Sequence, residues 1–125
     1  MKIVIFENEF NNLRTSFEAV NLLYFNDSLE FQQFNTFQDF GKIEKLSDFD
    51  FAIIDIDLSP KSELDGYQII EKISELKGKQ PKIIILTGHL NIEEQLKARN
   101  LPLLPIITKP VDFNSIKNAL SSDGN

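Results

Sequence analysis

Six polar residues end, or closely follow, short apolar runs in this 125-residue chain: Glu7, Asn8, Asp55, Asp57, Thr87 and Lys109. Clustered carboxylates repel one another unless a cation lies between them, and oxygen ligands are the ones that Mg²⁺ prefers. A carboxylate is also a nucleophile toward a phosphoryl group, whose negative oxygens are stabilised by a metal ion, a hydroxyl and an ammonium group. If these residues meet, the set is suited to forming an aspartyl phosphate.

The elements that would position these residues follow from hydrophobic patterning. Short apolar runs over 2–6, 29–34, 51–54, 82–86 and 106–108 indicate five strands, of which the second is the weakest. Helical patterns cover about 9–24, 37–46, 69–76 and 92–99, and Asp112 is a suitable N-cap for a last helix that includes Phe113, Ile116 and Leu120. Gly41 weakens the second helix by about 1 kcal/mol. This alternation predicts a doubly wound α/β fold, a five-stranded parallel sheet with helices on both faces.

Composition limits the function classes. The chain has a net charge of −6 and scattered basic residues, which argues against direct nucleic-acid binding. It has no cysteine, which excludes disulfides and zinc–thiolate sites, and no apolar run long enough to span a membrane. The N-terminal run meets Glu7 too early for a signal peptide, so we expect a cytoplasmic protein.

In an open parallel sheet, ligands bind beyond the carboxyl ends of the strands, which is where the six residues are expected. Their sequence motifs resemble those of response-regulator receiver domains, which have a flavodoxin-like topology. The resemblance runs from Lys2 to about Leu120, so we expect one receiver domain over 1–120, with 121–125 a tail or the start of a linker. Its motifs are 2–9, 51–55, 64–66, 84–88 and 107–110.

This resemblance implies a phosphorylation-dependent switch of a two-component phosphorelay. Asp55 would accept a phosphoryl group from a histidine kinase or a phosphotransfer protein. Glu7, Asn8, Asp55 and the backbone carbonyl of Asp57 would hold Mg²⁺. Thr87 would bond a phosphoryl oxygen, Lys109 would pair with the phosphoryl group, and the Lys109–Pro110 peptide would be cis. The domain would not be an enzyme beyond its own phosphoryl transfer and autodephosphorylation.

The resemblance also implies an output surface on the fourth helix, the fifth strand and the fifth helix, used for a homodimer or an effector. Four leucines add apolar surface near that face and are either core or partner contacts: Leu96, Leu101, Leu103 and Leu104.

Several residues depart from the family pattern. Asn8 stands where a coordinating carboxylate is common, which predicts weaker Mg²⁺ binding. Ile106 stands where an aromatic residue is common, so an aromatic rotamer switch is not available. The loop between Asp55 and Asp65 is a few residues longer than usual, with 60–63 as the excess, and is expected to contact the kinase or shield the phosphoryl group. Asp57 would orient water or repel the phosphoryl group. His89 is interpreted as a solvated loop residue, or else as an internal phosphoryl acceptor or a residue that tunes water access beside Thr87.

Two alternatives remain. A pseudo-receiver would keep the fold and bind proteins without phosphorylation, which Asn8 and Ile106 support and the retained Asp55, Thr87 and Lys109 oppose. A haloacid-dehalogenase-like phosphatase would use Asp55 and Asp57 as nucleophile and acid. That family, however, places this pair on an early strand and has an acidic pair after its lysine.

Overall fold

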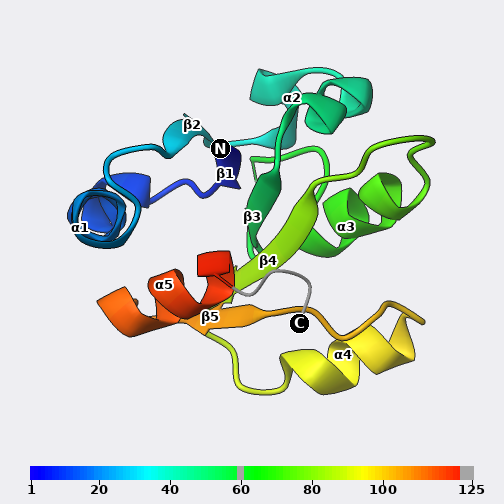
Figure 1. Ribbon diagram of the computed structural model, residues 1–125. Coiled ribbons are helices and arrows are strands. Elements are labelled where there is room, and N and C mark those ends of the chain that lie inside the picture. The colour runs from blue at the N-terminus through cyan, green and yellow to red at the C-terminus, as the bar shows by residue number, and fades with distance from the viewer. Residues whose placement is uncertain (59–60, 122–125) are drawn as a thin grey trace.

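Residues 1–58 and 61–121 are described in the computed structural model, and within them five parallel strands form one sheet in the order β2-β1-β3-β4-β5 (Figure 1). The strands are β1 (Lys2–Phe6), β2 (Glu30–Phe34), β3 (Phe51–Asp55), β4 (Lys82–Thr87) and β5 (Ile106–Thr108). This order places the strand that ends at Asp55 in the middle of the sheet. The predicted doubly wound α/β fold is confirmed.

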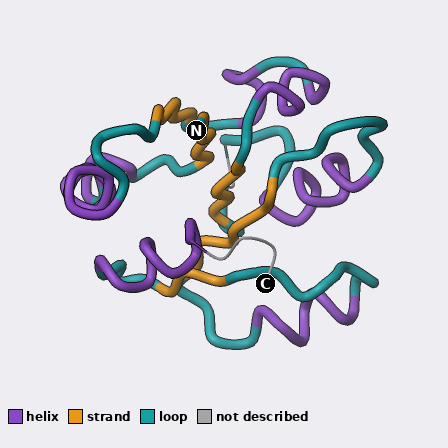
Figure 2. Tube along the Cα trace, viewed as in Figure 1, coloured by secondary structure: helices purple, strands orange, loops and turns teal. Residues whose placement is uncertain are grey.

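Helices cover both faces of the sheet, as Figure 2 shows by the helical coils on either side of the strands. α1 (Arg14–Tyr24) and α5 (Phe113–Ser121) pack on one face through Phe17, Val20 and Ile116. α2 (Phe37–Phe40), α3 (Gly66–Ser74) and α4 (Ile92–Ala98) pack on the other. The sheet is therefore buried on both sides, as a parallel sheet must be.

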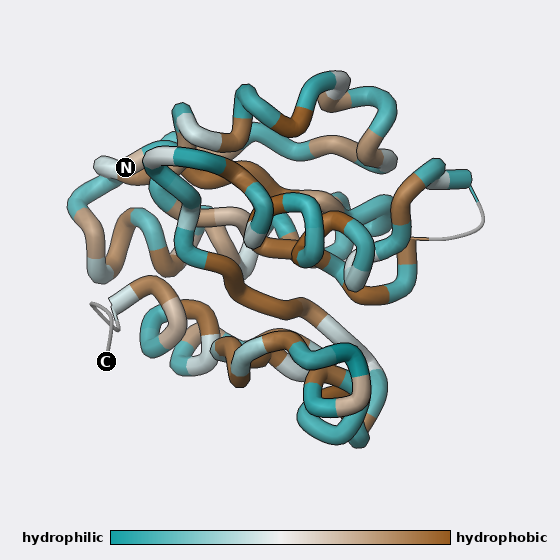
Figure 3. The backbone as a smooth tube through the Cα atoms, turned by 90° about the vertical axis from the view of Figure 1, so that its right-hand side faces the viewer, coloured by the Kyte–Doolittle hydropathy of each residue, from teal (hydrophilic) through white to brown (hydrophobic). Residues whose placement is uncertain are grey.

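Burial of the central strands explains their sequence. Every residue of β3 is buried, and the apolar residues lie along the strands inside the molecule (Figure 3). Phe6 contacts the rings of Phe34, Phe37 and Phe40 at centroid distances of 5.5–6.2 Å. Phe6, Phe34, Phe37 and Phe40 thus fill the core beneath α2.

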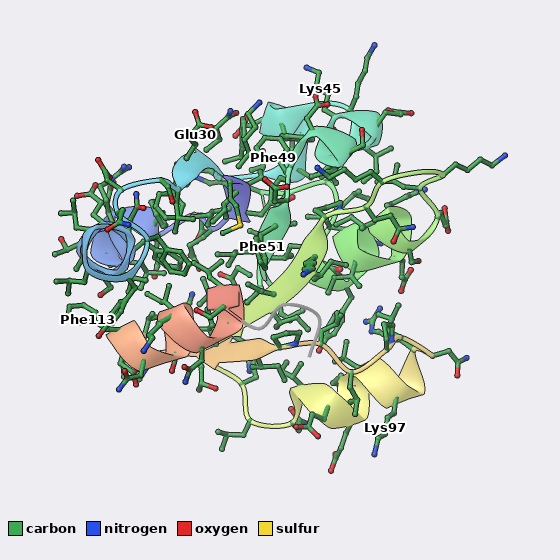
Figure 4. All side chains as sticks on the ribbon, in the orientation of Figure 1. Glu30, Lys45, Phe49, Phe51, Lys97 and Phe113 are labelled. Carbon is green, nitrogen blue, oxygen red and sulfur yellow. The ribbon has the colours of Figure 1, made fainter. Side chains whose placement is uncertain are left out.

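Side chains at the surface behave differently, as Figure 4 shows for Lys45 and Lys97, which project away from the body of the domain. None of the helices within the described residues has the length and apolarity that a bilayer crossing needs.

The prediction of one helix over 37–46 was wrong. α2 ends at Phe40 because Gly41 adopts φ +105°, a left-handed conformation that glycine tolerates and that stops the helix. The chain then forms a separate 3₁₀ helix, η2 (Ile43–Asp48). The first predicted helix is also divided, into a 3₁₀ turn, η1 (Phe10–Asn12), and α1.

The start of α3 is pressed against the end of β3. Asp65 caps the helix by accepting from Gln68 N at 2.8 Å, and the Gln68 side chain returns the bond to Asp65 N at 2.9 Å. A Cβ on Gly66 would lie 2.5 Å from both Asp55 O and Ile56 Cα. Only glycine therefore allows this close approach, which fixes the backbone next to Asp55.

Candidate functional site

Three charged side chains meet at the carboxyl ends of β1, β3 and β5. Glu7 follows β1 and is fully buried, and Asp55 ends β3 and is 3% exposed. Lys109 follows β5, two strands from Asp55, and its long side chain reaches across the end of β4. Its Nζ lies 2.8 Å from Glu7 Oε2 and 3.2 Å from Asp55 Oδ2. The structure thus brings together three of the predicted site residues.

The two carboxylates are held in the same way. Asp55 Oδ1 accepts from Asp57 N at 2.9 Å, and Glu7 Oε1 accepts from Glu9 N at 2.9 Å. Each carboxylate therefore has one oxygen fixed by the backbone of its own loop and the other oxygen directed to Lys109. The sequence did not predict this arrangement, because both backbone donors belong to loops without a regular pattern.

Burial makes these charges expensive. Burial and the neighbouring Glu7 carboxyl raise the pKa of Asp55 to about 7, against the lowering effects of the Asp57 amide and Lys109. Burial would lower the pKa of Lys109, but the Glu7 and Asp55 carboxyls outweigh it and raise that pKa. Lys109 is therefore charged, while the two carboxyls compete for one cation.

Thr87 ends β4 beside Asp55 and is 1% exposed. Its Oγ1 accepts from His89 N at 2.9 Å, so the hydroxyl is turned toward the loop that follows β4. Among the described residues no hydrogen bond joins Thr87 to Asp55. Thr87 nevertheless stands at the end of its strand beside Asp55, at the strand end where the sequence placed it.

Asn8 and the carboxylate of Asp57 lie at the rim of the site. Asn8 is exposed and lines a shallow pocket of about 310 Å³ with Glu9, Asn35, Thr36 and Lys61. The Asp57 side chain is 66% exposed, and its Oδ2 lies 3.9 Å from His89 Nε2. Both positions were singled out in the sequence, and the Asp57 backbone N–H is the one that donates to the buried Asp55 carboxylate.

The donor set can be tested against Mg²⁺. No group of three or more acidic or histidine side chains converges in the described part of the chain. Mg²⁺, however, keeps several waters and needs only one or two carboxylates. Glu7 Oε2 is buried and, although Lys109 Nζ is near, accepts no hydrogen bond of regular geometry. Two buried carboxylates, one oxygen of which lacks a hydrogen-bond donor, fit a divalent cation.

The loop before α3 is tied to α2, which the sequence did not predict. Ser62 Oγ accepts from Phe37 N at 3.0 Å, and Gln38 contacts the loop twice, at Lys61 O (2.6 Å) and Glu63 N (2.8 Å). Lys61, from the predicted excess over 60–63, lines the pocket beside Asn8, whereas residue 60 lies outside the described residues. A capping pattern, Thr36 accepting from Asp39 N, was the readable signal for this helix start.

Two further predictions can be compared with the structure. The Lys109–Pro110 peptide is cis, as predicted. Ile106 is half-buried and lines a groove of about 540 Å³ together with residues 89–94, Lys97 and Thr108. Of the four leucines near the expected output face, Leu96 is core, Leu101 and Leu104 pack against the core, and Leu103 is 63% exposed.

Comparisons with known proteins identify the family of this chain. The profile of the response regulator receiver domain family matches residues 8–121. A comparison with curated protein sequences gave no significant match.

Solved structures share the fold at low sequence identity. The response regulatory domain of the protein mrkE from Klebsiella pneumoniae is 23% identical, with a TM-score of 0.73 over 96% of this chain and 92% of that one. The signal receiver domain of a DNA-binding response regulator (merR) from Colwellia psychrerythraea 34H is 16% identical, with a TM-score of 0.75 over 96% and 94%. A CheY-like receiver domain protein from Methanospirillum hungatei JF-1 is 21% identical, with a TM-score of 0.69 over 95% and 89%. The family match spans most of the chain, and the chain belongs to the response regulator receiver domain family.

Proposed function

We propose that this receiver domain is a phosphorylation-dependent switch and that Asp55 accepts the phosphoryl group from a phosphohistidine. The donor would be a histidine kinase or a histidine phosphotransfer protein. The observation that carries the proposal is the contact of one ammonium group, Lys109, with two buried carboxylates, one of which ends the central strand. A buried acid whose charge is costly is typical of a functional site rather than of a surface ion pair.

The chemistry follows from the positions of the side chains. One oxygen of the ionised Asp55 carboxylate attacks phosphorus, the new P–O bond forms as the P–N bond of the phosphohistidine breaks, and the imidazole leaves. Asp57 N and Lys109 favour the ionised form of Asp55, and Lys109 then offsets the charge on the phosphoryl oxygens. Mg²⁺, when bound, would neutralise further charge; Glu7, Asp55, the Asn8 amide and the Asp57 carbonyl would hold it.

Phosphorylation would act through the loop that follows β4. A phosphoryl group on Asp55 offers an acceptor for the Thr87 hydroxyl proton, which the bond that Oγ1 accepts from His89 N does not use, and the new bond would draw Thr87 and its loop toward Asp55. The change biases a two-state equilibrium of that loop and of the neighbouring α4. Leu90, which is 96% exposed, and Leu103 offer apolar contacts for an effector or a second copy on the surface that α4, β5 and α5 form.

One observation favours a pseudo-receiver as the second candidate. Asn8 is an exposed, uncharged amide, so this position adds no third carboxylate to the buried pair of Glu7 and Asp55. The domain would then bind a partner through its surface without phosphorylation. The phosphatase alternative is disfavoured, because the carboxylate that would serve as its acid, Asp57, is exposed and directed to His89.

The test is binding of beryllofluoride, a phosphoryl analogue, in millimolar Mg²⁺, followed by amide NMR shifts. Wild-type protein should show Mg²⁺-dependent shifts at Asp55, Thr87 and Lys109, and Asp55→Asn should abolish them. Asp48→Asn, at an exposed acid at the end of η2, is the matched control and should bind like wild type. A wild-type protein that shows no shifts would overturn the proposal in favour of the pseudo-receiver.

A further inference from the structure

The start of β4 has a free edge, because β5 is too short to pair with it. β4 begins at Lys82, but its pairing with β5 begins only at Ile85, which lies opposite Ile106. Ile85 N donates to Pro105 O at 2.9 Å, so the backbone groups of Ile85 point toward the β5 side. Alternation along the strand then directs the N–H and the C=O of Ile83 to the same side. The first turn of the ladder on this side therefore lacks a second strand.

The segment that precedes β5 does not supply the missing partners. If the ladder continued, Ile83 N would donate to Leu103 O, and Ile83 O would accept from the backbone nitrogen of residue 105. Residue 105 is a proline, which has no N–H, and Leu103 is 63% exposed. Within residues 1–58 and 61–121, no hydrogen bond joins Ile83 to the segment over 102–105. Pro105 therefore ends the ladder and leaves both backbone groups of Ile83 unpaired on this side.

This edge lies in a groove of about 360 Å³ at the end of the sheet opposite to Asp55. Phe51, which is labelled in Figure 4, and Ile83 line the groove from the first residues of β3 and β4. Apolar residues from α3, from the segment before β5 and from α5 complete its lining: Ile70, Leu104 and Ala119. Among the described residues that line the groove, Lys82 is the one that carries a charge. The volume lies in the range of ligand-binding clefts.

The chemistry of the groove matches an extended peptide. A donor and an acceptor on one residue of a strand edge are complementary to the C=O and N–H groups of an added strand. Proline and lysine alone are enough to protect an edge from unwanted pairing, and both are present. Protection does not require an apolar recess beside the edge, whereas an added strand uses such a recess for its side chains. Lys82 favours an acidic residue at the mouth of the groove.

We propose that this groove binds an extended segment of a partner protein, which adds a short strand to β4 at Ile83. An aliphatic or aromatic side chain of that segment would fill the groove, and an acidic side chain would lie beside Lys82. The site is at the other end of the sheet from Asp55 and uses none of the groups of the proposed phosphorylation site. The partner therefore binds the domain whether or not Asp55 is phosphorylated.

Hydrogen exchange of the free protein tests the open edge without any ligand. The Ile83 amide should exchange about tenfold faster than the Ile85 amide or more, because the latter donates to Pro105 O. An Ile83 amide that is as protected as that of Ile85 would overturn the proposal.

Binding is tested with a library of acetylated and amidated pentapeptides, followed by the amide NMR shifts of the full chain. Leu, Ile, Val or Phe stands at the centre of each peptide, and Asp, Lys or Ser stands at the flanking positions. We expect shifts at Ile83, Leu104 and Ala119, with tighter binding of the acidic peptides. Methylation of one peptide nitrogen at a time should identify the N–H that pairs with Ile83 O, with binding weakened by about three- to tenfold.

Two variants with matched controls test the two polar features of the groove. Pro105→Ala gives the domain its own N–H opposite Ile83 O and should weaken peptide binding by about two- to fivefold. Pro102→Ala, in the same groove but not opposite Ile83, should leave the affinity unchanged. Lys82→Glu should remove the preference for acidic peptides, whereas Lys45→Glu, at an exposed lysine of η2 outside the groove, should keep it.

The other outcomes overturn the proposal in different ways. A library without any member that shifts the groove residues at millimolar concentration would mean that the edge is only protected. Binding that tolerates methylation of every peptide nitrogen would mean that the groove takes apolar molecules without pairing to a backbone. Shifts confined to α4 and β5 would move the peptide site elsewhere. None of these results depends on phosphorylation of Asp55, which the beryllofluoride experiment tests separately.

Discussion

The two levels of the site differ in how their charges are held. At the buried level, Lys109 Nζ lies within 3.2 Å of two carboxylates that are at most 3% exposed. At the rim, Asp57 and His89 lie 3.9 Å apart and both are more than half exposed. Strand register places the buried charges, whereas loop conformation places the exposed ones. The comparison shows that the buried charges, whose desolvation is unfavourable, lie at strand ends, whereas the exposed charged contact lies between loops.

Removing the Lys109 ammonium group should destabilise the buried charges, and this should be the largest effect of the four variants. Lys109→Met leaves two buried carboxyls without their cation, and breaking a buried ion pair costs about 3–5 kcal/mol. We expect a lower free energy of unfolding in urea at pH 8, with a smaller loss at pH 5 because a carboxyl then takes up a proton. Adding Glu7→Gln should recover much of the loss. A single variant as stable as wild type would show that the ammonium does not support the buried pair.

Gly66→Ala should damage the backbone on which the buried level rests. The new Cβ would lie 2.5 Å from Asp55 O and Ile56 Cα, so α3 must move away from β3, at a cost of about 1–3 kcal/mol. Thermal unfolding measures the loss. Gly88→Ala is the matched control, because a Cβ there meets nothing within 4 Å and should leave stability nearly unchanged. Equal behaviour of the two variants would contradict the close approach.

Asp55→Asn should change how the free energy of unfolding depends on pH, because the buried Asp55 carboxyl is unfavourable in its ionised form. The pKa of Asp55 is raised to about 7 in the folded state, above the value of about 3.9 in an unfolded chain. Between these values the folded protein binds a proton that the unfolded chain releases, so stability falls as pH rises from about 4 to 7. Wild type should therefore lose about 2–3 kcal/mol relative to Asp55→Asn between pH 5 and pH 8 in metal-free buffer. If the free energies of unfolding of wild type and Asp55→Asn change in parallel with pH, the pKa of Asp55 is not raised in the folded state.

Asn8→Asp tests the exposed rim of the site, and its effect, on Mg²⁺ affinity, should be the smallest of the four. A carboxylate at this exposed position adds about 1 kcal/mol of attraction for a nearby cation, or about fivefold in Mg²⁺ affinity measured by NMR titration. Asn35→Asp, in the same shallow pocket but after β2, is the control and should change affinity less. Equal gains in the two variants would mean that the effect is general charge rather than coordination.

The sequence predicted the parts of the molecule that depend on local pattern. The buried strand that delivers Asp55 was readable because four apolar residues in a row indicate burial on both faces. The five alternations of strand and helix predicted the parallel sheet, and hence the edge where Glu7, Asp55 and Lys109 meet. The break at Gly41 was missed as a boundary, because the apolar positions on either side of it still fit a helical period.

Residue identity and order along the chain determined the fold class, the candidate acceptor and the set of groups around it, because periodicity and strand ends are properties of neighbouring residues. Tertiary structure decided which of those groups touch. Lys109 Nζ lies near Glu7 as well as Asp55, Asn8 lines a pocket with Asn35 and Lys61, and Asp57 Oδ2 lies 3.9 Å from His89 Nε2. These contacts join segments distant in sequence, and their distances depend on strand register, on the close approach at Gly66 and on loop conformation, none of which a local pattern encodes.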